Sequence, residues 1–281
     1  MKDDSAQRLI DELHTTACAQ GASFYTDPAN GYAVFTAVAL KRNRSCCGCG
    51  CRHCPFGHML VPAGARDELV TDPWMEENAD DSSSACDILF WSGGKDAYLA
   101  LRRLQRENAR PVILLTTYDG RTERVAHQDV DLDTVRTQAE TLALDHMLVP
   151  LFPHIEYIDR VTLAIRQVVM KRPVHRVVFG DLHLEHIRQW RVDNLGPRLT
   201  PHSIQLCFPL WQVPYTELMD EMFREDVDYV VSAVTSERCA PHLRVGDHLT
   251  PAVLQALPTD IDRFGENGEF HTAIRLRTSS G

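Results

Sequence analysis

The sequence of 281 residues lacks the long apolar runs that membrane proteins need. No stretch approaches the roughly 18 consecutive apolar residues of a membrane span. The first residues, MKDDSAQRLIDELH, lack the basic start and the apolar stretch of a signal peptide. We therefore expect a soluble, cytoplasmic protein without a membrane partner. Global disorder is also disfavoured, because hydrophobic residues make up 44% and charged residues 24% of the chain, as in ordinary globular proteins.

Acidic residues are absent between Asp27 and Asp67, where five lysines and arginines occur, whereas the stretch from Asp67 to Asp87 contains eight acids and no base. The net charge of −10 makes nucleic acid a less favoured partner, although the basic stretch leaves contact with RNA open. The acidic stretch has the composition of a linker. We therefore divide the chain into a cysteine-rich domain over residues 1–65, an acidic linker over 66–85 and a larger domain over 86–281.

After the linker, short apolar runs alternate with amphipathic helices. The predicted strands are residues 88–91, 112–117, 147–151, 174–179, 204–208 and 227–234. This alternation predicts an α/β fold with a parallel, doubly wound sheet that is covered on both faces, and ligands of such sheets bind at the carboxyl ends of the strands. In the first domain we expect a helix over residues 5–14 and a strand over residues 32–40.

A candidate phosphate loop, Ser92-Gly93-Gly94-Lys95-Asp96, lies between the first of these strands and a predicted helix. Glycines let the backbone approach a phosphate, the helix N-terminus attracts its charge, and Lys95 adds a cation. The Walker A pattern is absent, because Leu89 stands where its first glycine belongs and Asp96 where it needs serine or threonine. Taken alone, the five residues fit either a phosphate loop or a tight turn with a capping serine.

Four segments carry a wider resemblance: WSGGKDAYLALRRL, FGDLHLEHIRQWRVDNL, FPLW and LPTDIDRFGENGEFHT. In order and spacing they are similar to the diphthine-ammonia ligase family and its bacterial relatives, which are N-type ATP pyrophosphatases (adenine nucleotide alpha hydrolases). The resemblance covers about residues 86–277 and implies a Rossmann-like sheet. It also implies that ATP and Mg²⁺ activate a small or protein-borne carboxylate as an acyl-adenylate, with release of pyrophosphate, and that ammonia then forms the amide.

The resemblance also implies roles for individual residues. Ser92, Gly93, Gly94 and Lys95 would hold the departing pyrophosphate, and Asp96 would hold Mg²⁺ or orient the loop. The predicted catalytic residues are Lys95, Asp96, Glu269 and His271, and Gly180 and Asp181 join the loop in binding the nucleotide. The predicted substrate-binding residues are His127, Arg188, Arg191, Glu266, Asn267 and Glu269.

Each of these residues has a plainer interpretation that the sequence leaves open. His127 fits a surface position, Asp181 a helix cap, the two arginines a solvated helix face, and the GENGEFHT segment a hairpin turn. The family's loop usually ends in serine, whereas this chain has Ala97. A nucleotide-binding regulator without turnover therefore stays an alternative.

Five of the nine cysteines fall within nine residues, too close together to staple distant segments; they are Cys46, Cys47, Cys49, Cys51 and Cys54. The segment SCCGCGCRHCPFGH and the preceding YTDPANGYAVFTAVALKR resemble a short cysteine-rich domain of unknown function over about residues 24–58. The spacing predicts a zinc ion or an iron–sulfur cluster, with free thiols as the alternative. Structural zinc usually uses two separated cysteine pairs, and His53 or His58 are possible substitutes for the missing pair. A second function therefore stays open, namely a tRNA-modifying ATP pyrophosphatase whose cluster carries sulfur.

Overall fold

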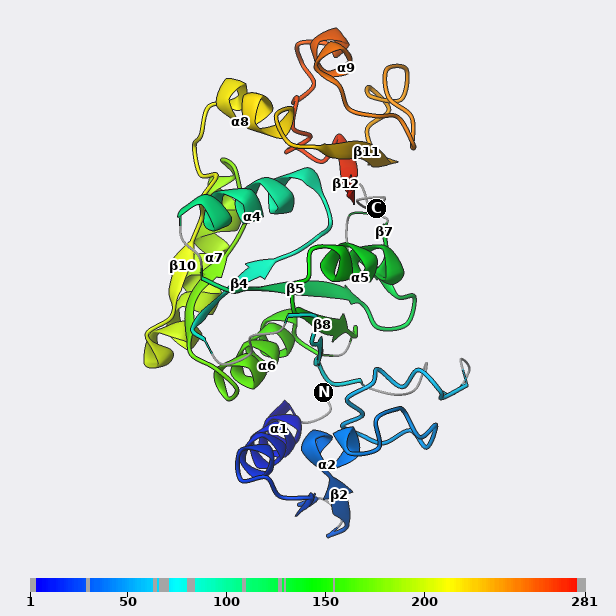
Figure 1. The fold of residues 1–281 in the computed structure, drawn as a ribbon, viewed down its shortest axis with the longest axis vertical. Helices are drawn as coiled ribbons and strands as arrows, with labels where there is room; N and C mark the ends of the chain where they lie inside the picture. The colour runs from blue at the N-terminus through cyan, green and yellow to red at the C-terminus, as the bar shows by residue number, and fades with distance from the viewer. Residues whose placement is uncertain are drawn as a thin grey trace.

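A mostly parallel sheet of eight strands forms the centre of the chain, between a small N-terminal unit and a C-terminal group of helices and strands (Figure 1). The computed structural model describes residues 4–28, 31–62, 65, 71–79, 84–107, 110–125, 128, 130–153 and 155–276. Among these residues, every helix is too short or too polar to cross a membrane.

The N-terminal unit contains two helices and a short hairpin. Its elements are α1 (Asp4–Ala19), β1 (Phe24–Thr26), β2 (Ala33–Phe35) and α2 (Ala37–Lys41). The helix predicted over residues 5–14 is confirmed and continues to Ala19. The prediction of a strand up to Leu40 is wrong beyond Phe35, because the Thr36 hydroxyl accepts a hydrogen bond from the Ala39 N–H at 3.2 Å and starts α2.

The central sheet has five parallel strands in the order β10-β9-β4-β5-β8. They are β4 (Cys86–Phe90), β5 (Val112–Asp119), β8 (His146–Leu151), β9 (Val174–Val178) and β10 (Gln205–Cys207). The predicted α/β fold with a parallel sheet is confirmed. The first of these strands, β4, has β5 on one side and β9 on the other, so the strand order reverses between β4 and β9, where ligands of such sheets bind.

Three short antiparallel strands complete this sheet. They are β3 (Trp74–Glu76), β6 (Arg124–Val125) and β7 (Val130–Asp131). The strand β3 pairs with β8 and buries Trp74, so part of the stretch predicted as an acidic linker is an edge strand of the sheet. The sequence analysis missed it because acidic composition dominates this stretch and only three residues pair.

Helices cover both faces of the sheet. On one face lie α4 (Lys95–Glu107) and α5 (Leu132–Thr141), and on the other lie α6 (Tyr157–Val169) and α7 (Glu185–Leu199), which is followed by the single turn η1 (Thr200–His202). Side chains of β5 alternate between the two cores, since Leu114 joins the first and Ile113 and Leu115 join the second. Burial on both faces explains why these strands read as continuous apolar runs.

The C-terminal part contains α8 (Tyr215–Met222), β11 (Val227–Val234), α9 (Pro251–Ala256) and β12 (Phe270–Leu276). The prediction that residues 227–234 continue the parallel sheet is wrong, because β11 pairs antiparallel with β12 in a separate sheet. Val227, Tyr229 and Val231 on one face of β11 belong to the same core as α4, whereas Asp228 and Ser232 on the other face are half-buried. The contacts of β12 with α4 and α5 bring the GENGEFHT segment to the start of α4.

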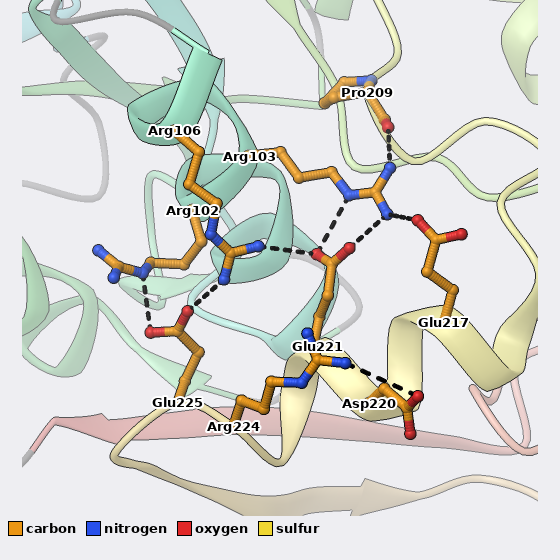
Figure 2. A network of polar contacts seen from close by, with 9 residues as sticks. All are labelled: Arg102, Arg103, Arg106, Pro209, Glu217, Asp220, Glu221, Arg224 and Glu225. Carbon is orange, nitrogen blue, oxygen red and sulfur yellow. Dashed lines mark hydrogen bonds and ion pairs between the residues drawn. The ribbon is translucent and has the colours of Figure 1, made fainter.

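Ion pairs fix α8 against α4 (Figure 2). Arg103 is central, since it donates hydrogen bonds to the carboxylates of Glu221 and Glu217 and to the Pro209 carbonyl oxygen. The flanking pairs join Arg102 and Arg106 of α4 to Glu225. The network holds the helix that begins at the candidate phosphate loop.

Candidate active site

The loop of residues 92–94 links the carboxyl end of β4 to the first turn of α4. Gly93 has a φ of +78°, and a Cβ atom there would lie 2.8 Å from the Gln138 side chain, so this position requires glycine. Its carbonyl oxygen accepts a hydrogen bond from the Ile274 N–H of β12 at 2.9 Å. The loop is therefore fixed between the central sheet and the C-terminal sheet.

At the start of α4, two side-chain hydroxyl groups accept hydrogen bonds from backbone N–H groups. The Gly94 N–H donates to the Ser92 hydroxyl at 3.4 Å, and the Lys95 N–H donates to the Thr272 hydroxyl at 3.1 Å. Both donors lie at the positive end of the helix dipole, where a phosphate would find them. An anion that binds here would replace the two hydroxyl oxygens as acceptor.

Lys95 and Asp96 form a mostly buried ion pair beside this loop. The Lys95 side chain is only 4% exposed, and its Nζ atom lies 2.8 Å from Asp96 Oδ2 and 5.3 Å from the centre of the Phe264 ring. Burial raises the pKa of Asp96, and the ammonium of Lys95 opposes this rise. Asp96 Oδ1 is buried and has no hydrogen-bond partner among the described residues, so it is a ready oxygen ligand for a cation.

Glu266 comes from the GENGEFHT segment, far away in the sequence, and faces the same ion pair. Burial, followed by the charge of Asp96, raises the pKa of Glu266 to about 8, and Lys95 opposes this rise. Asp262 and Asp181 add to the negative charge. Carboxylates that crowd around one ammonium favour the binding of a further cation or a proton.

The loop that carries Glu266 is organised by two other carboxylates. Asp262 Oδ1 accepts hydrogen bonds from the N–H groups of Phe264, at 2.7 Å, and of Glu266, at 3.3 Å. Glu269 accepts from the Asp262 N–H and from both the backbone and the side chain of Asn267, at 3.0 to 3.2 Å. Both oxygens of Glu269 thus accept hydrogen bonds inside the loop, and the catalytic role predicted for Glu269 and the substrate contact predicted for Asn267 stay predictions.

Two adjoining cavities meet at Asp96, Gln128 and Glu266. The smaller, of about 170 Å³, is lined by Lys95 and by the C-terminal loop, including His271. The larger, of about 390 Å³, lies between the carboxyl ends of β4 and β9 and falls in the size range of small-molecule sites. Its polar lining includes Ser92, Asp181 and Arg191, and its apolar lining includes Phe179 and Tyr157.

The predicted residues after β9 lie in and beside the larger cavity. Gly180 approaches α4 closely, since a Cβ atom there would lie 2.9 Å from the Asp96 carbonyl oxygen. Asp181 forms a two-bond ion pair with Arg191 at 2.6 and 2.9 Å, and the guanidinium lies 4.0 Å from the centre of the Phe179 ring. Arg188 instead packs on the rings of Phe208 and Trp211. His127 lies outside the described residues.

The thiols of the five cysteines in the N-terminal unit contact one another, and Cys49 also contacts the carbonyl oxygen of Cys47 at 3.6 Å. The Sγ atoms of Cys46 and Cys54 are 3.8 Å apart and buried, those of Cys47 and Cys51 are 3.4 Å apart, and Cys49 is exposed. Burial, followed by the hydrogen bond with Cys47, raises the pKa of Cys51 to about 11. Because the described residues bring no three of these sulfurs within 4.8 Å of one another, a metal centre on all five cysteines stays a prediction.

Comparison with known proteins assigns the N-terminal unit. Residues 13–60 match a family of unknown function, DUF5522. The match contains all five clustered cysteines and agrees with the cysteine-rich domain predicted over residues 24–58. A similar solved structure is described as the predicted subunit of a tRNA methyltransferase from Methanocaldococcus jannaschii. It is 14% identical, with 68% of this chain and 95% of that chain covered and a TM-score of 0.36.

The sequence analysis missed three residues that shape the site. Gln138 is buried and donates to the carbonyl oxygens of Gly93 and Ile274, while its own side-chain oxygen accepts from the Trp91 indole. The sequence feature that could have pointed to Gln138 is its place as a polar residue on the apolar face of a predicted helix. Thr272 is the last residue of the GENGEFHT segment, and its hydroxyl accepts a hydrogen bond from the Lys95 N–H. Tyr215, which donates a hydrogen bond to Asp262 at 2.9 Å, stands in no sequence pattern that marks it as a site residue.

Proposed function

We propose that this chain is an ATP-dependent ligase that activates a carboxylate, releases pyrophosphate and joins the carboxylate to ammonia. The observation that carries the proposal is the convergence of Lys95, Asp96 and Glu266 in one cleft at the carboxyl ends of β4 and β9. All three residues stand in the segments that resemble the diphthine-ammonia ligase family. The proposal therefore rests on the local geometry and on that resemblance together.

The loop and the start of α4 supply what a departing pyrophosphate needs. The N–H groups of Gly94 and Lys95 would donate to phosphate oxygens in place of the Ser92 and Thr272 hydroxyls. The Lys95 ammonium adds a full positive charge within a mostly buried setting, where charge stabilisation is strong. These groups act where negative charge develops as the bond between the α and β phosphates breaks.

The donor set fits a magnesium ion as well as the nucleotide. Asp96 Oδ1 and Gln128 Oε1 are buried oxygens without hydrogen-bond partners among the described residues, and hard Mg²⁺ prefers oxygen ligands. Asp96 and Gln128 would hold the ion, which would offset the charge of the phosphates. Asp96 and Gln128 line both cavities, so an ion held by them would lie between the cavity beside Lys95 and the larger cavity between β4 and β9.

Glu266 fits the ammonia side of the reaction. A carboxylate next to a triphosphate repels it, so Glu266 is a poor choice for holding ATP but a good one for holding ammonium. With its pKa raised to about 8, Glu266 has a substantial ionised fraction only near pH 8 and above, and that carboxylate form could take a proton from ammonium and leave ammonia free to attack. We assign to Glu266 the acceptor-side role that the sequence had suggested for Glu269.

Product analysis tests the proposal. The purified chain is incubated with Mg²⁺, ATP, ammonium and a panel of carboxylates, and the nucleotides are separated. We expect AMP and pyrophosphate, and we expect Lys95→Ala to lower their formation about a hundredfold, because a few kcal/mol of leaving-group stabilisation is lost. Arg102→Ala, on the same helix but directed at Glu225, is the matched control and should keep its activity. Formation of ADP and phosphate would contradict the proposal, and equal inactivity of wild type and Lys95→Ala would favour a regulator.

A further inference from the structure

Two histidines and one aspartate converge at the boundary between the N-terminal unit and the central sheet. His14 belongs to α1, His53 lies in the cysteine-rich loop, and Asp72 precedes β3. One ligand atom from each lies within 4.8 Å of the others, and all three residues are at least 94% buried, with exposures of 4%, 1% and 6%. Among the described residues, no other histidine, cysteine or acidic side chains converge in this way.

The two imidazole rings pack against each other. They stack with their centres 3.6 Å apart and their planes within 5° of parallel. His53 uses Nδ1 to contact the Asp72 carboxylate and Nε2 to contact the Tyr25 hydroxyl at 2.8 Å. The Ala37 N–H donates to His14 Nε2 at 3.1 Å, so the other ring nitrogen of His14 carries the proton in this state.

Further contacts surround the group as outer partners surround a metal site. Arg160 lies 3.9 Å from Asp72 Oδ1 and is itself fixed by the Pro150 carbonyl oxygen at 3.0 Å. The Cys18 thiol lies 3.2 Å from His14 Nε2. Such outer partners orient the ligands and tune the charge of a bound ion.

His14, His53 and Asp72 all line one cavity of about 240 Å³. The rest of its lining is largely apolar and comes from both units; it includes Val38, Pro55, Met75, Met147 and Met170. Cys18 and Cys54 also line this cavity. An ion held by the three residues would therefore border the cavity and could take a further ligand from it, as in catalytic rather than closed structural zinc sites.

We infer that His14, His53 and Asp72 form a site for a zinc-class transition-metal ion, with a fourth position open to this cavity. Imidazole nitrogen and carboxylate oxygen are the donors of such sites. Two parallel rings 3.6 Å apart cannot both direct an in-plane lone pair at one ion, so zinc binding would turn at least one imidazole about its Cβ–Cγ bond. The three ligand atoms, which lie within 4.8 Å of one another, would then close on zinc bonds of about 2.0–2.2 Å. The inference moves the metal from the five cysteines to the histidines and does not depend on the proposed ligase function.

Zinc binding by the full chain, with X-ray absorption spectroscopy of the zinc-loaded wild type, tests the inference. We expect one tight site whose first shell contains nitrogen and oxygen at about 2.0–2.2 Å and at most one sulfur. His14→Ala and Asp72→Asn should each lower zinc affinity at least about a hundredfold, whereas His242→Ala, an exposed histidine far along the chain, should not.

The spectrum of the wild type keeps the test decisive if a variant fails to fold. A shell of three or four sulfurs at about 2.3 Å would assign the metal to the cysteines and overturn the inference. Zinc binding that is absent, or equally tight in folded His14→Ala and Asp72→Asn, would overturn it too.

Discussion

Replacing Glu269 by glutamine tests the structural role that the carboxylate has in the C-terminal loop. The two carboxylate oxygens accept three hydrogen bonds, from the Asp262 N–H and from the backbone and side chain of Asn267. Glu269→Gln removes the charge and turns an NH₂ group toward one of these donors. A hydrogen bond to a charged group contributes about 1.5–3 kcal/mol, and a buried N–H without a partner adds to the loss. We expect the free energy of unfolding to fall by about 2–3 kcal/mol.

The assay is urea unfolding of the wild type, Glu269→Gln and the control Asn267→Ala. The control removes only the exposed side-chain donor and should cost less than about 1 kcal/mol. ATP cleavage should weaken in Glu269→Gln as well, because the Asp262 loop that positions Glu266 becomes looser. Unchanged unfolding together with a tenfold or greater loss of amide formation would refute this reasoning and return Glu269 to the acceptor side.

Three further predictions concern stability. His146 is buried and desolvation lowers its pKa to about 3, so its contribution is complete above pH 6.5 and is lost as the pH falls toward 3. In urea unfolding this residue should account for about 2 kcal/mol less stability at pH 5 than at pH 7, and His146→Asn should remove that share, while His14, whose pKa burial lowers to about 4, adds a separate loss that remains. Glu221→Gln should lower the unfolding free energy by about 1–2 kcal/mol in low salt, whereas Asp220→Asn, at an exposed pair, should change it by less than about 0.5 kcal/mol; equal effects would contradict the network of Figure 2. Gln138→Leu should cost about 1–3 kcal/mol in thermal or urea unfolding, because the buried Trp91 N–H loses its acceptor, and normal stability would contradict that role.

Local patterns predicted most of the central sheet. The apolar runs at 88–91 and 112–117 became β4 and β5, because strands buried on both faces need continuous apolar side chains. The pairing of β11 with β12 could not be predicted, since it joins segments far apart in the sequence and depends on packing against α4. The start of α2 was missed because a single capping hydroxyl at Thr36 outweighed the strand-like composition that follows.

The candidate site could be predicted in part. The structure brings Lys95, Asp96 and Glu266 together, as the resemblance to the diphthine-ammonia ligase family had implied, and their roles stay predictions. The directions in which the Glu266 and Glu269 side chains point could not be predicted from the sequence, because they depend on a turn at Gly265. There φ is +69°, and a Cβ atom would lie 2.5 Å from the Phe270 carbonyl oxygen. The metal-ligand geometry of His14, His53 and Asp72 was equally out of reach, since three separate segments form it.

We propose that the cleft between β4 and β9 directs attack at the α phosphate of ATP. If water takes the place of the carboxylate in slow background turnover, cleavage in water labelled with the heavy oxygen isotope tests this without the natural substrate. Mass spectrometry of the products should find the label in AMP and unlabelled pyrophosphate, with both products lost in Lys95→Ala. Label in pyrophosphate, or in phosphate beside ADP, would contradict the account.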